Sequence, residues 1–261
     1  MNRRIILTLV VLLSASALAR VIGDNPAAKT RIDPKADDVL KKSCTCLAEL
    51  QQFGIKVEET FDEMSASGQK TQLSNWRSVF VSRPNRIMAE SEGDTAKRHF
   101  YYDGKTITLY DPEAKLYAID KAPATIDAMF DYLNETHGFS LPTADLLFTD
   151  PYKVLTEQVE EGEYLGLHRV GEKKCHHLGF RQRGVDWQLW VDSGEKPLPL
   201  KFLITYRRLP GEPQFATVFT WDVSAKPSDD VFAFKPPQGA KKIEFVINKN
   251  APSKEKTPDK P

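Results

Sequence analysis

The sequence predicts one mostly antiparallel β domain with helices, curved around an apolar cavity. Three observations support this prediction. Apolar side chains alternate with a period of two from Ile55 onward and again after about residue 164. Short turn sequences separate these runs, and connections of that length join only antiparallel neighbours. Two amphipathic helix patterns accompany the strands, and each needs an apolar surface to cover.

The first residues have the layout of a secretory signal. Arg3 and Arg4 supply positive charge, Ile5–Leu13 is apolar, and residues 17–19 form an Ala-Leu-Ala cleavage site. The apolar run is too short for a bilayer, which needs roughly 20 residues, although an uncleaved anchor is the competing interpretation. We therefore expect residues 1–19 to be removed and the mature chain to be soluble in the periplasm or another exported compartment.

A helix is expected from Asp33 to Phe53. Asp33 can accept hydrogen bonds from the first helical turn, Pro34 suits the first helical position, and Gly54 supplies the stop. Alternating runs then predict the first set of strands. These are Ile55–Met64, Leu73–Arg83, Arg86–Glu92, Lys97–Asp103, Thr106–Asp111 and Leu116–Asp120, with Asp103-Gly104 as the strongest hairpin signal.

The alternation stops near residue 125, where a second amphipathic helix is expected. Thr125 caps it, and Gly138 ends it. The following stretch, Phe139–Leu155, is rich in Leu, Phe and Pro, with short helical pieces expected around Ala144–Phe148 and Tyr152–Leu155. Strands resume at Tyr164–Val170, Lys173–Arg181, Val185–Asp192, Leu200–Arg208 and Phe215–Val223.

The remaining segments set the domain limits. Residues 20–32 resemble a loose leader, and the last residues mix Lys, Pro and Asp with few apolar side chains, which is typical of a disordered tail. We expect a signal peptide at 1–19, a leader at 20–32, one domain at 33–247 and a tail at 248–261. Removal of the signal takes away Arg3 and Arg4, leaving 34 basic and 36 acidic residues, a balance that argues against nucleic-acid binding.

Aromatic side chains recur at alternate positions of several predicted strands, so each of these strands has one apolar face. A curved sheet this apolar has to be covered by helices or by a ligand, and both alternatives stay open. The candidate cavity residues are Trp76, Phe80, Phe100, Tyr102, Met129, Phe130, Leu133, Trp187, Phe202, Phe219 and Trp221. Trp190, three positions after Trp187, must point to the opposite face, where Phe232–Pro237 is the expected cover.

Three cysteines, Cys44, Cys46 and Cys175, are candidates for a disulfide between the first helix and the sheet. Unpaired buried thiols and intermolecular pairing are the alternatives. Together with His177 they contain the ligand types of a zinc site, but their spacing is wrong for one, so no metal is expected. His176 and His177 with Asp186 suggest acid–base chemistry, yet no nucleophile or phosphate-loop pattern accompanies them, so neither an enzyme nor a cofactor is predicted.

Several short sequences together resemble a known family. They are Arg83-Pro84, Tyr101-Tyr102-Asp103-Gly104-Lys105, Leu141-Pro142, Asp150-Pro151-Tyr152, Cys175-His176-His177-Leu178, Asp186-Trp187-Gln188-Leu189-Trp190 and Pro236-Pro237 with Gly239-Ala240. The chain resembles the DUF2092 predicted periplasmic proteins over about residues 33–246. The resemblance implies a fold similar to the lipoprotein carriers LolA and LolB, incomplete antiparallel barrels whose helices plug an apolar hollow.

The sequence and the resemblance lead to one functional expectation. The first helix and the Thr125–Leu155 region act as plug and lid of an incomplete barrel, which binds a lipid or acyl chain without catalysis. An exported or membrane-associated protein partner is also expected. The alternatives are a cysteine-based redox or metal-binding protein and a protein-interaction module.

Overall fold

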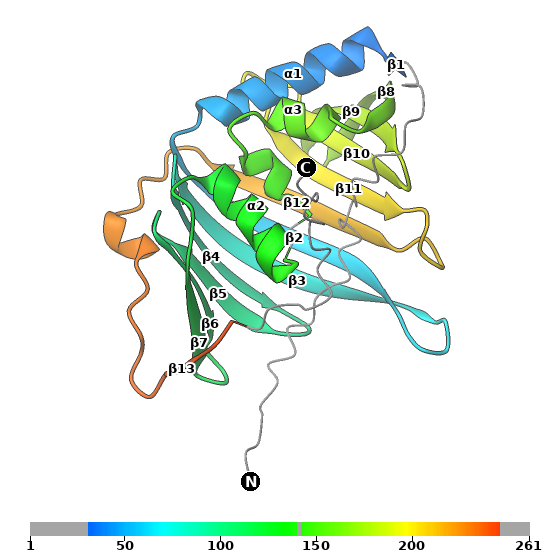
Figure 1. The fold of residues 1–261 in the computed structure, drawn as a ribbon. Coiled ribbons are helices and arrows are strands. Elements are labelled where there is room, and N and C mark those ends of the chain that lie inside the picture. The colour runs from blue at the N-terminus through cyan, green and yellow to red at the C-terminus, as the bar shows by residue number, and fades with distance from the viewer. Residues whose placement is uncertain (1–30, 140–141, 246–261) are drawn as a thin grey trace, which may run out of the picture.

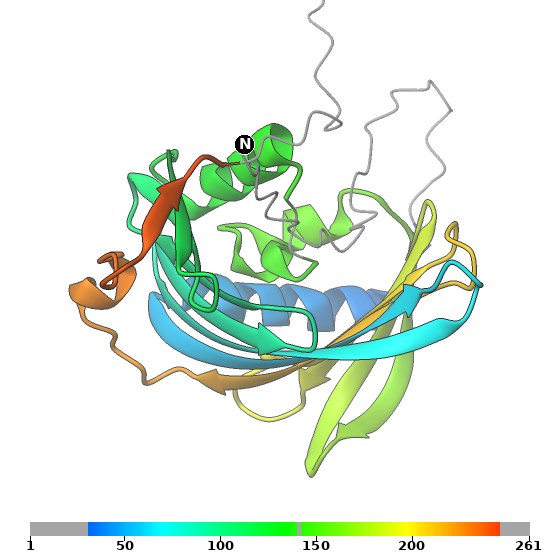
Figure 2. The ribbon, with the colours of Figure 1, turned by 90° about the horizontal axis from the view of Figure 1, so that it is seen from below.

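The structure is a computed structural model that describes residues 31–139 and 142–245. Thirteen strands form one sheet in the order β1-β8-β9-β10-β11-β12-β2-β3-β4-β5-β6-β7-β13. The end strands β1 and β13 do not pair, so the sheet is a curved, open arc rather than a closed barrel, and the helices lie inside the arc (Figures 1 and 2). The predicted fold class, a mostly β domain built on an incomplete antiparallel barrel, is confirmed.

The strands before the second helix are β1 (Arg31–Ile32), β2 (Gln52–Met64), β3 (Lys70–Ser82), β4 (Arg86–Gly93), β5 (Lys97–Tyr102), β6 (Thr106–Asp111) and β7 (Leu116–Lys121). Those after it are β8 (Val159–Val170), β9 (Lys173–Gln182), β10 (Val185–Asp192), β11 (Pro199–Tyr206), β12 (Gln214–Asp222) and β13 (Lys241–Ile243). Pairing is antiparallel except that β1 joins β8 and β13 joins β7 in parallel.

The ends of the chain were predicted to be a signal peptide, a leader and a tail. Residues 1–19 and 248–261 lie outside the described residues, as do residues 20–30 of the leader. Its last two residues, Arg31 and Ile32, form strand β1 and lie opposite Glu161 and Gly162 of β8. The described part of the leader is therefore an edge strand, because its backbone finds partners along β8.

Helix α1 spans Pro34–Glu49 and starts as the sequence predicts. The Asp33 carboxylate accepts hydrogen bonds from the backbone N–H groups of Lys35 and Ala36. Its predicted end at Phe53 is wrong, because Leu50 is already extended and Phe53 pairs with Val81 in the sheet. Sheet pairing thus starts before the glycine that was expected to stop the helix.

Helix α2 (Ile126–His137), the 3-10 helix η1 (Ala144–Leu147) and helix α3 (Pro151–Thr156) form the second helical region, which we call the cap. Thr125 caps α2 through its side-chain oxygen, and Gly138 adopts the left-handed conformation (φ 63°) that ends a helix. The predicted pieces of this region are therefore all present. No helix in the described ranges is long and apolar enough to cross a membrane.

The concave side of the sheet, which we call the inner face, carries the main core. Along β2 it presents Phe53, Ile55 and Val57, and α1 packs on it through Ala36, Leu40 and Leu47, all almost fully buried. The cap covers the neighbouring part of the same face with Met129 and Leu133. Both helical regions therefore fill the hollow of the arc from one side (Figure 2).

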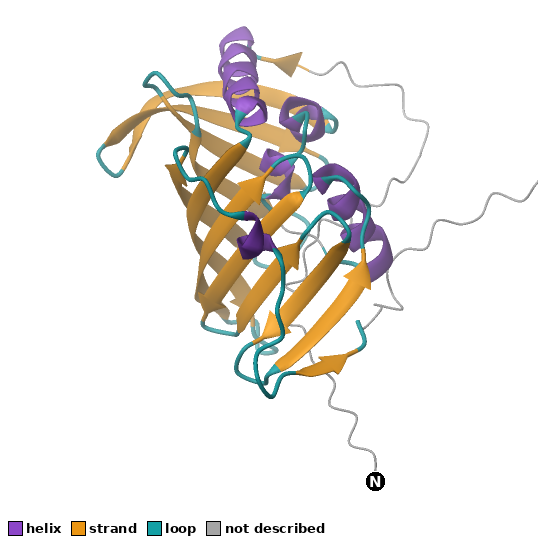
Figure 3. Ribbon diagram, turned by 90° about the vertical axis from the view of Figure 1, so that its left-hand side faces the viewer, coloured by secondary structure: helices purple, strands orange, loops and turns teal. Residues whose placement is uncertain are grey.

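The convex side, or outer face, is covered in part by the segment that follows β12. The 3-10 helix η2 (Asp229–Phe232) and the loop after it lie over the outer face before β13 joins the sheet edge (Figure 3). Within this segment the ring of Phe234 packs against Tyr101, Tyr110 and Tyr117, with ring centroids 5.1–5.4 Å apart. The chain thus straps its own β5–β7 region from outside.

Candidate functional site

The predicted cavity residues divide between the two faces of the sheet. Phe100, Tyr102, Trp187, Phe202, Phe219 and Trp221 lie on the inner face, and Met129, Phe130 and Leu133 of the cap pack against it. Trp76 and Phe80 do not belong to this set. They alternate with inner-face Arg77 and Val79 on β3, so they point outward, and Trp76 is 53% exposed.

The inner-face aromatic residues form a continuous stack at the β9–β11 region. Trp187 lies between Phe180 and Phe202, with centroid distances of 4.1 and 5.5 Å and nearly parallel planes. All three side chains are buried. The hollow at this place is closed by side chains of the protein, so the predicted aromatic surface is a packed core.

The cap covers a neighbouring part of the hollow. Met129 is fully buried, Leu133 is 3% exposed, and Phe130 stacks on Phe148 at 5.8 Å. A ligand under the cap therefore has to displace these side chains. Helices cover most of the predicted inner-face residues, whereas Phe100 and Trp221 are half-buried.

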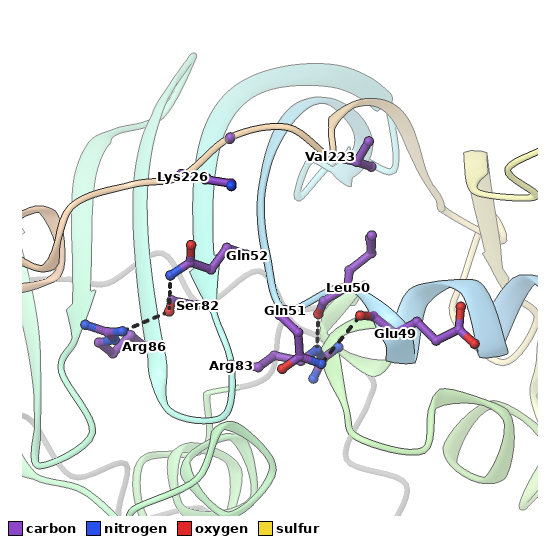
Figure 4. A pocket seen from close by; sticks show the side chains of 10 residues that line it. Glu49, Leu50, Gln51, Gln52, Ser82, Arg83, Arg86, Val223 and Lys226 are labelled. Atoms are coloured by element: carbon purple, nitrogen blue, oxygen red, sulfur yellow. Dashed lines mark hydrogen bonds between the residues drawn. The ribbon is translucent and has the colours of Figure 1, made fainter.

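A pocket of about 490 Å³ lies elsewhere, at the rim where α1 passes into β2. We call it the rim pocket. It is lined by Glu49, Leu50, Gln51, Gln52, Ser82, Arg83, Arg86, Val223, Ala225 and Lys226. In Figure 4, Ser82, Arg86, Gln52 and Lys226 lie on one side of it, Leu50 and Val223 on the other, and Arg83 between them. None of the predicted cavity residues lines this pocket.

Arg83, at the end of β3, connects the rim pocket with both helical regions. Its Nε donates to the Leu50 carbonyl at 3.1 Å, its Nη1 to that of Leu147 at 2.7 Å, and its Nη2 to that of Phe148 at 3.4 Å. Burial lowers the pKa of Arg83, and the attraction of Asp127 raises it against that effect. One partly buried cation thus holds both the C-terminal end of α1 and the cap to the sheet.

A second polar tie joins the cap to the other end of the arc. Asp120 of β7 accepts from the Tyr132 hydroxyl at 2.7 Å and lies 3.2 Å from His137 Nε2. Burial raises the pKa of Asp120, but hydrogen bonds from Tyr132, the Lys121 backbone and His137 lower it by more. The pKa of Asp120 is therefore below its usual value. Burial and Asp120 together raise the pKa of Tyr132 to about 12.

Of the alternatives for the cysteines, a bridge or unpaired thiols, the structure has the second, and all three are free thiols. Cys44 packs in the inner core under α1, whereas Cys175 lies on the outer face of β9 in a separate cluster with Trp190 and Leu200. The sheet itself separates the two sulfurs. Burial, with a contribution from Asp150, raises the pKa of Cys44 to about 12, as expected of a buried unpaired thiol.

The four residues with the ligand types of a zinc site do not come together either. Cys44 and Cys46 lie on α1, whereas Cys175 and His177 lie on the outer face of the sheet. The described residues contain no cluster of three metal-ligating side chains. His177 also does not contact the carboxylate of Asp186, which was suggested as its partner. His177 contacts His168 and Gln188, whereas Asp186 is paired with Arg181 and Arg207.

Trp190 points outward, opposite to Trp187, as the strand period requires. Its ring stacks on His177 at 3.9 Å, and the Lys201 ammonium lies 4.8 Å from its centroid. The expected cover, Phe232–Pro237, lies instead over the β5–β7 region. This segment lies over β5–β7 rather than over Trp190, because Phe234 packs against Tyr101, Tyr110 and Tyr117.

Sequence reasoning noticed Arg83-Pro84 only as part of a resemblance. A cation at the end of an apolar strand, directly before a proline that ends the strand, is the local signal that could have singled out Arg83. Its three carbonyl partners belong to segments far away in sequence, so no local pattern indicates them.

Comparison with solved structures finds several similar folds. LprF from Mycobacterium bovis has 11% identity and a TM-score of 0.46, covering 76% of this chain and 98% of LprF. An uncharacterized conserved protein from Thermus thermophilus has 13% identity and a TM-score of 0.45, covering 80% and 99%. The LolA superfamily protein NE2245 from Nitrosomonas europaea has 10% identity and a TM-score of 0.32, covering 76% and 97%.

Comparison with curated proteins finds no match. The family comparison is decisive: a family described as "Predicted periplasmic protein (DUF2092)" matches residues 36–246, which include α1, the cap and nearly the whole sheet. The chain belongs to the DUF2092 family of predicted periplasmic proteins.

Proposed function

We propose that the protein is an exported, non-catalytic binder or carrier of a lipid or similar hydrophobic molecule. The observation that carries the proposal is the nature of the cover on the inner face. The aromatic face of the arc is covered at the cap by short helices, and polar ties at Arg83 and Asp120 hold the edges of this cap. A cover of this kind can leave without breaking the sheet.

The ligand would take the place of the cap side chains on the inner face. Met129, Phe130 and Leu133 would move out, and an acyl chain would lie against the part of the inner face that they cover, which continues toward Phe219, Phe202 and Trp187. Each buried CH₂ group contributes about 0.8 kcal/mol, so a long chain can replace the burial that the cap loses. The breakable contacts are the hydrogen bonds of Arg83 and Asp120 rather than covalent or sheet contacts.

The proposal includes a place of action. The family description and the N-terminal signal pattern both support export to the periplasm, where a hydrophobic molecule needs a protein to cross water. A membrane-associated or exported partner would deliver or accept the ligand. Its identity follows from the ligand, so the ligand is the first object of the test.

The four tryptophans provide the test, because two lie on each face. Trp187 and Trp221 are on the inner face, and Trp76 and Trp190 are on the outer face. Brominated fatty acids quench tryptophans that they contact. We expect quenching in Trp76→Phe/Trp190→Phe, which keeps the inner pair, and none in the matched Trp187→Phe/Trp221→Phe, which keeps the outer pair.

Native mass spectrometry of protein purified from the periplasm is the second measurement. We expect a bound lipid at one copy per chain. Bare polypeptide in that spectrum, together with equal or absent quenching in the two tryptophan variants, would rule out the carrier. Circular dichroism of both variants confirms that they are folded. If the inner double variant is not, Trp187→Phe and Trp221→Phe are measured singly, and we expect each to lose part of the quenching seen in the intact protein.

A further inference from the structure

The rim pocket has an excess of positive charge. Its lining includes three cations, Arg83, Arg86 and Lys226, and one carboxylate, Glu49. Figure 4 shows the Glu49 side chain pointing away from the cations. Arg86 is paired with the exposed Asp229 of η2, which is not part of the lining. Within the described residues, no carboxylate lies within ion-pair distance of Arg83 or Lys226.

Arg83 is the informative member of the set. A partly buried guanidinium is normally paired with a carboxylate or another anion, because burial without a counter-charge is unfavourable. Here it donates to three neutral carbonyls, of Leu50, Leu147 and Phe148, and the carboxylate that attracts it, Asp127, lies beyond ion-pair distance. A guanidinium has five N–H groups, so two donors remain after these three bonds. The pocket wall therefore carries a charged donor with capacity for one more acceptor.

The other polar groups beside Arg83 are also donors or can act as donors. Arg86 Nη2 donates to the buried Ser82 hydroxyl at 3.0 Å, and the Gln52 amide donates to the same hydroxyl at 3.3 Å. The Lys226 ammonium is exposed at the mouth. Arginine forks and ammonium groups together are the usual contacts of carboxylate and phosphate groups.

We propose that the rim pocket binds an anionic oxygen group, a carboxylate or a phosphate. Arg83, Arg86 and Lys226 contact the anion, and the pocket volume of about 490 Å³ accommodates a head group of that kind. The opposite wall suggests how the rest of the molecule lies. Leu50 and Val223 line the pocket and also pack against the inner core, so an apolar chain can continue from the pocket toward the inner face.

In this form the inference rests on the proposed carrier function and names its ligand class: an amphiphile with an anionic head. The same chemistry fits a free phosphate. The two sources differ in the chain, since an amphiphile adds contacts beyond the pocket and inorganic phosphate does not. The experiment therefore needs an arm for each source.

The first arm compares dodecanoic acid with dodecanol, which have the same chain and differ in charge. We expect the intact protein to bind the acid roughly tenfold or more tightly, because charge-assisted hydrogen bonds are added. Arg86→Gln/Lys226→Gln removes two of the three cations and should lose most of this preference. The control Arg181→Gln/Lys105→Gln removes the same charge from exposed positions away from the pocket and should keep the preference for the acid.

The second arm titrates inorganic phosphate alone into the same three proteins by calorimetry. Binding that is lost in the rim variant and kept in the control, without any preference between acid and alcohol, assigns the pocket to a free anion. Thermal unfolding checks that the rim variant is folded, and Lys226→Gln alone replaces it if it is not.

Two results would overturn the anion site alone. One is equal affinity of the intact protein for acid and alcohol with no phosphate binding, which leaves the carrier proposal standing. The other is a preference for the acid that the rim variant retains in full. Binding of none of the three compounds overturns both proposals, so failure of the carrier is distinguished from failure of the pocket.

Discussion

The two helical regions on the inner face are attached to the sheet in different ways. Helix α1 contributes Ala36, Leu40 and Leu47 to the core and continues directly into β2. The cap also buries apolar side chains, but its edges depend on hydrogen bonds to Arg83 and Asp120. The difference teaches that α1 is part of the core of the sheet, whereas the cap is a cover whose attachment includes breakable polar contacts.

The largest expected effect concerns α1. Leu40→Ala should lower the free energy of unfolding by about 2–5 kcal/mol, because a fully buried leucine leaves a cavity in the core. Chemical denaturation measures this change. Hydrogen exchange in the cap should not differ from the intact protein beyond the global loss. A loss well below 1 kcal/mol would show that α1 is as loosely attached as the cap.

The next effect concerns Arg83, whose hydrogen bonds hold the cap to the sheet. Arg83→Met should lower the free energy of unfolding by about 1–3 kcal/mol, since the carbonyls of Leu50, Leu147 and Phe148 lose their donor. Hydrogen exchange should accelerate in α2 and η1 and stay unchanged in α1 except in its last turn before Leu50, with increased binding of a hydrophobic dye. Arg181→Met, at an exposed ion pair, is the control. Equal acceleration in α1 and α2 would contradict the comparison.

The cap also contains a partly buried acid, Asp145 of η1. Burial raises its pKa to about 6 from the usual 3.8. In the unfolded chain the group ionises at lower pH, so its ionised form destabilises the folded state, and this cost grows as the pH rises from about 4 to about 6. Below that range the group is neutral in both states.

Asp145→Asn removes the charge and tests this sign. The variant should be more stable than the intact protein by about 1–2 kcal/mol near pH 7.5, and the difference should disappear near pH 4. Denaturation curves at the two pH values measure it, with Asp94→Asn as an exposed control. A variant that is less stable at the higher pH would show that the carboxylate is a favourable contact of the cap.

The smallest effect is expected outside the arc. Trp76 is 53% exposed on the outer face, so Trp76→Ser should change the free energy of unfolding by less than about 0.5 kcal/mol. Phe219→Ala, on the inner face, should lower it by about 3–5 kcal/mol. Similar losses for both, measured by denaturation, would contradict the assignment of faces.

The local features of the fold could be read from the sequence. Asp33 and Thr125 cap helices where expected, Gly138 ends α2, and the Asp103-Gly104 turn joins β5 and β6. Each of these features depends on interactions between residues that are close together in the chain, so the sequence alone predicts it. The short turns also required antiparallel neighbours, and every hairpin has them.

The candidate site could be predicted only in part. A period of two shows which side chains share a face of a strand, but it does not say which face becomes the inner one. For that reason Phe202 and Phe219 lie on the inner face as expected, whereas Trp76 and Phe80 lie on the outer face. The parallel edge strands β1 and β13 were also missed, because each has only a few residues and gains its partners from distant strands.

The sequence by itself determined the caps, turns, strand period and family of this protein. Only the tertiary structure decided that two helical regions pack into the hollow, that Cys44 and Cys175 lie on opposite sides of the sheet, and that Arg83 meets three distant carbonyls beside the rim pocket. The physical reason is range. Backbone preferences act between neighbours in the chain, whereas packing and charge burial depend on segments that meet only when the sheet curves.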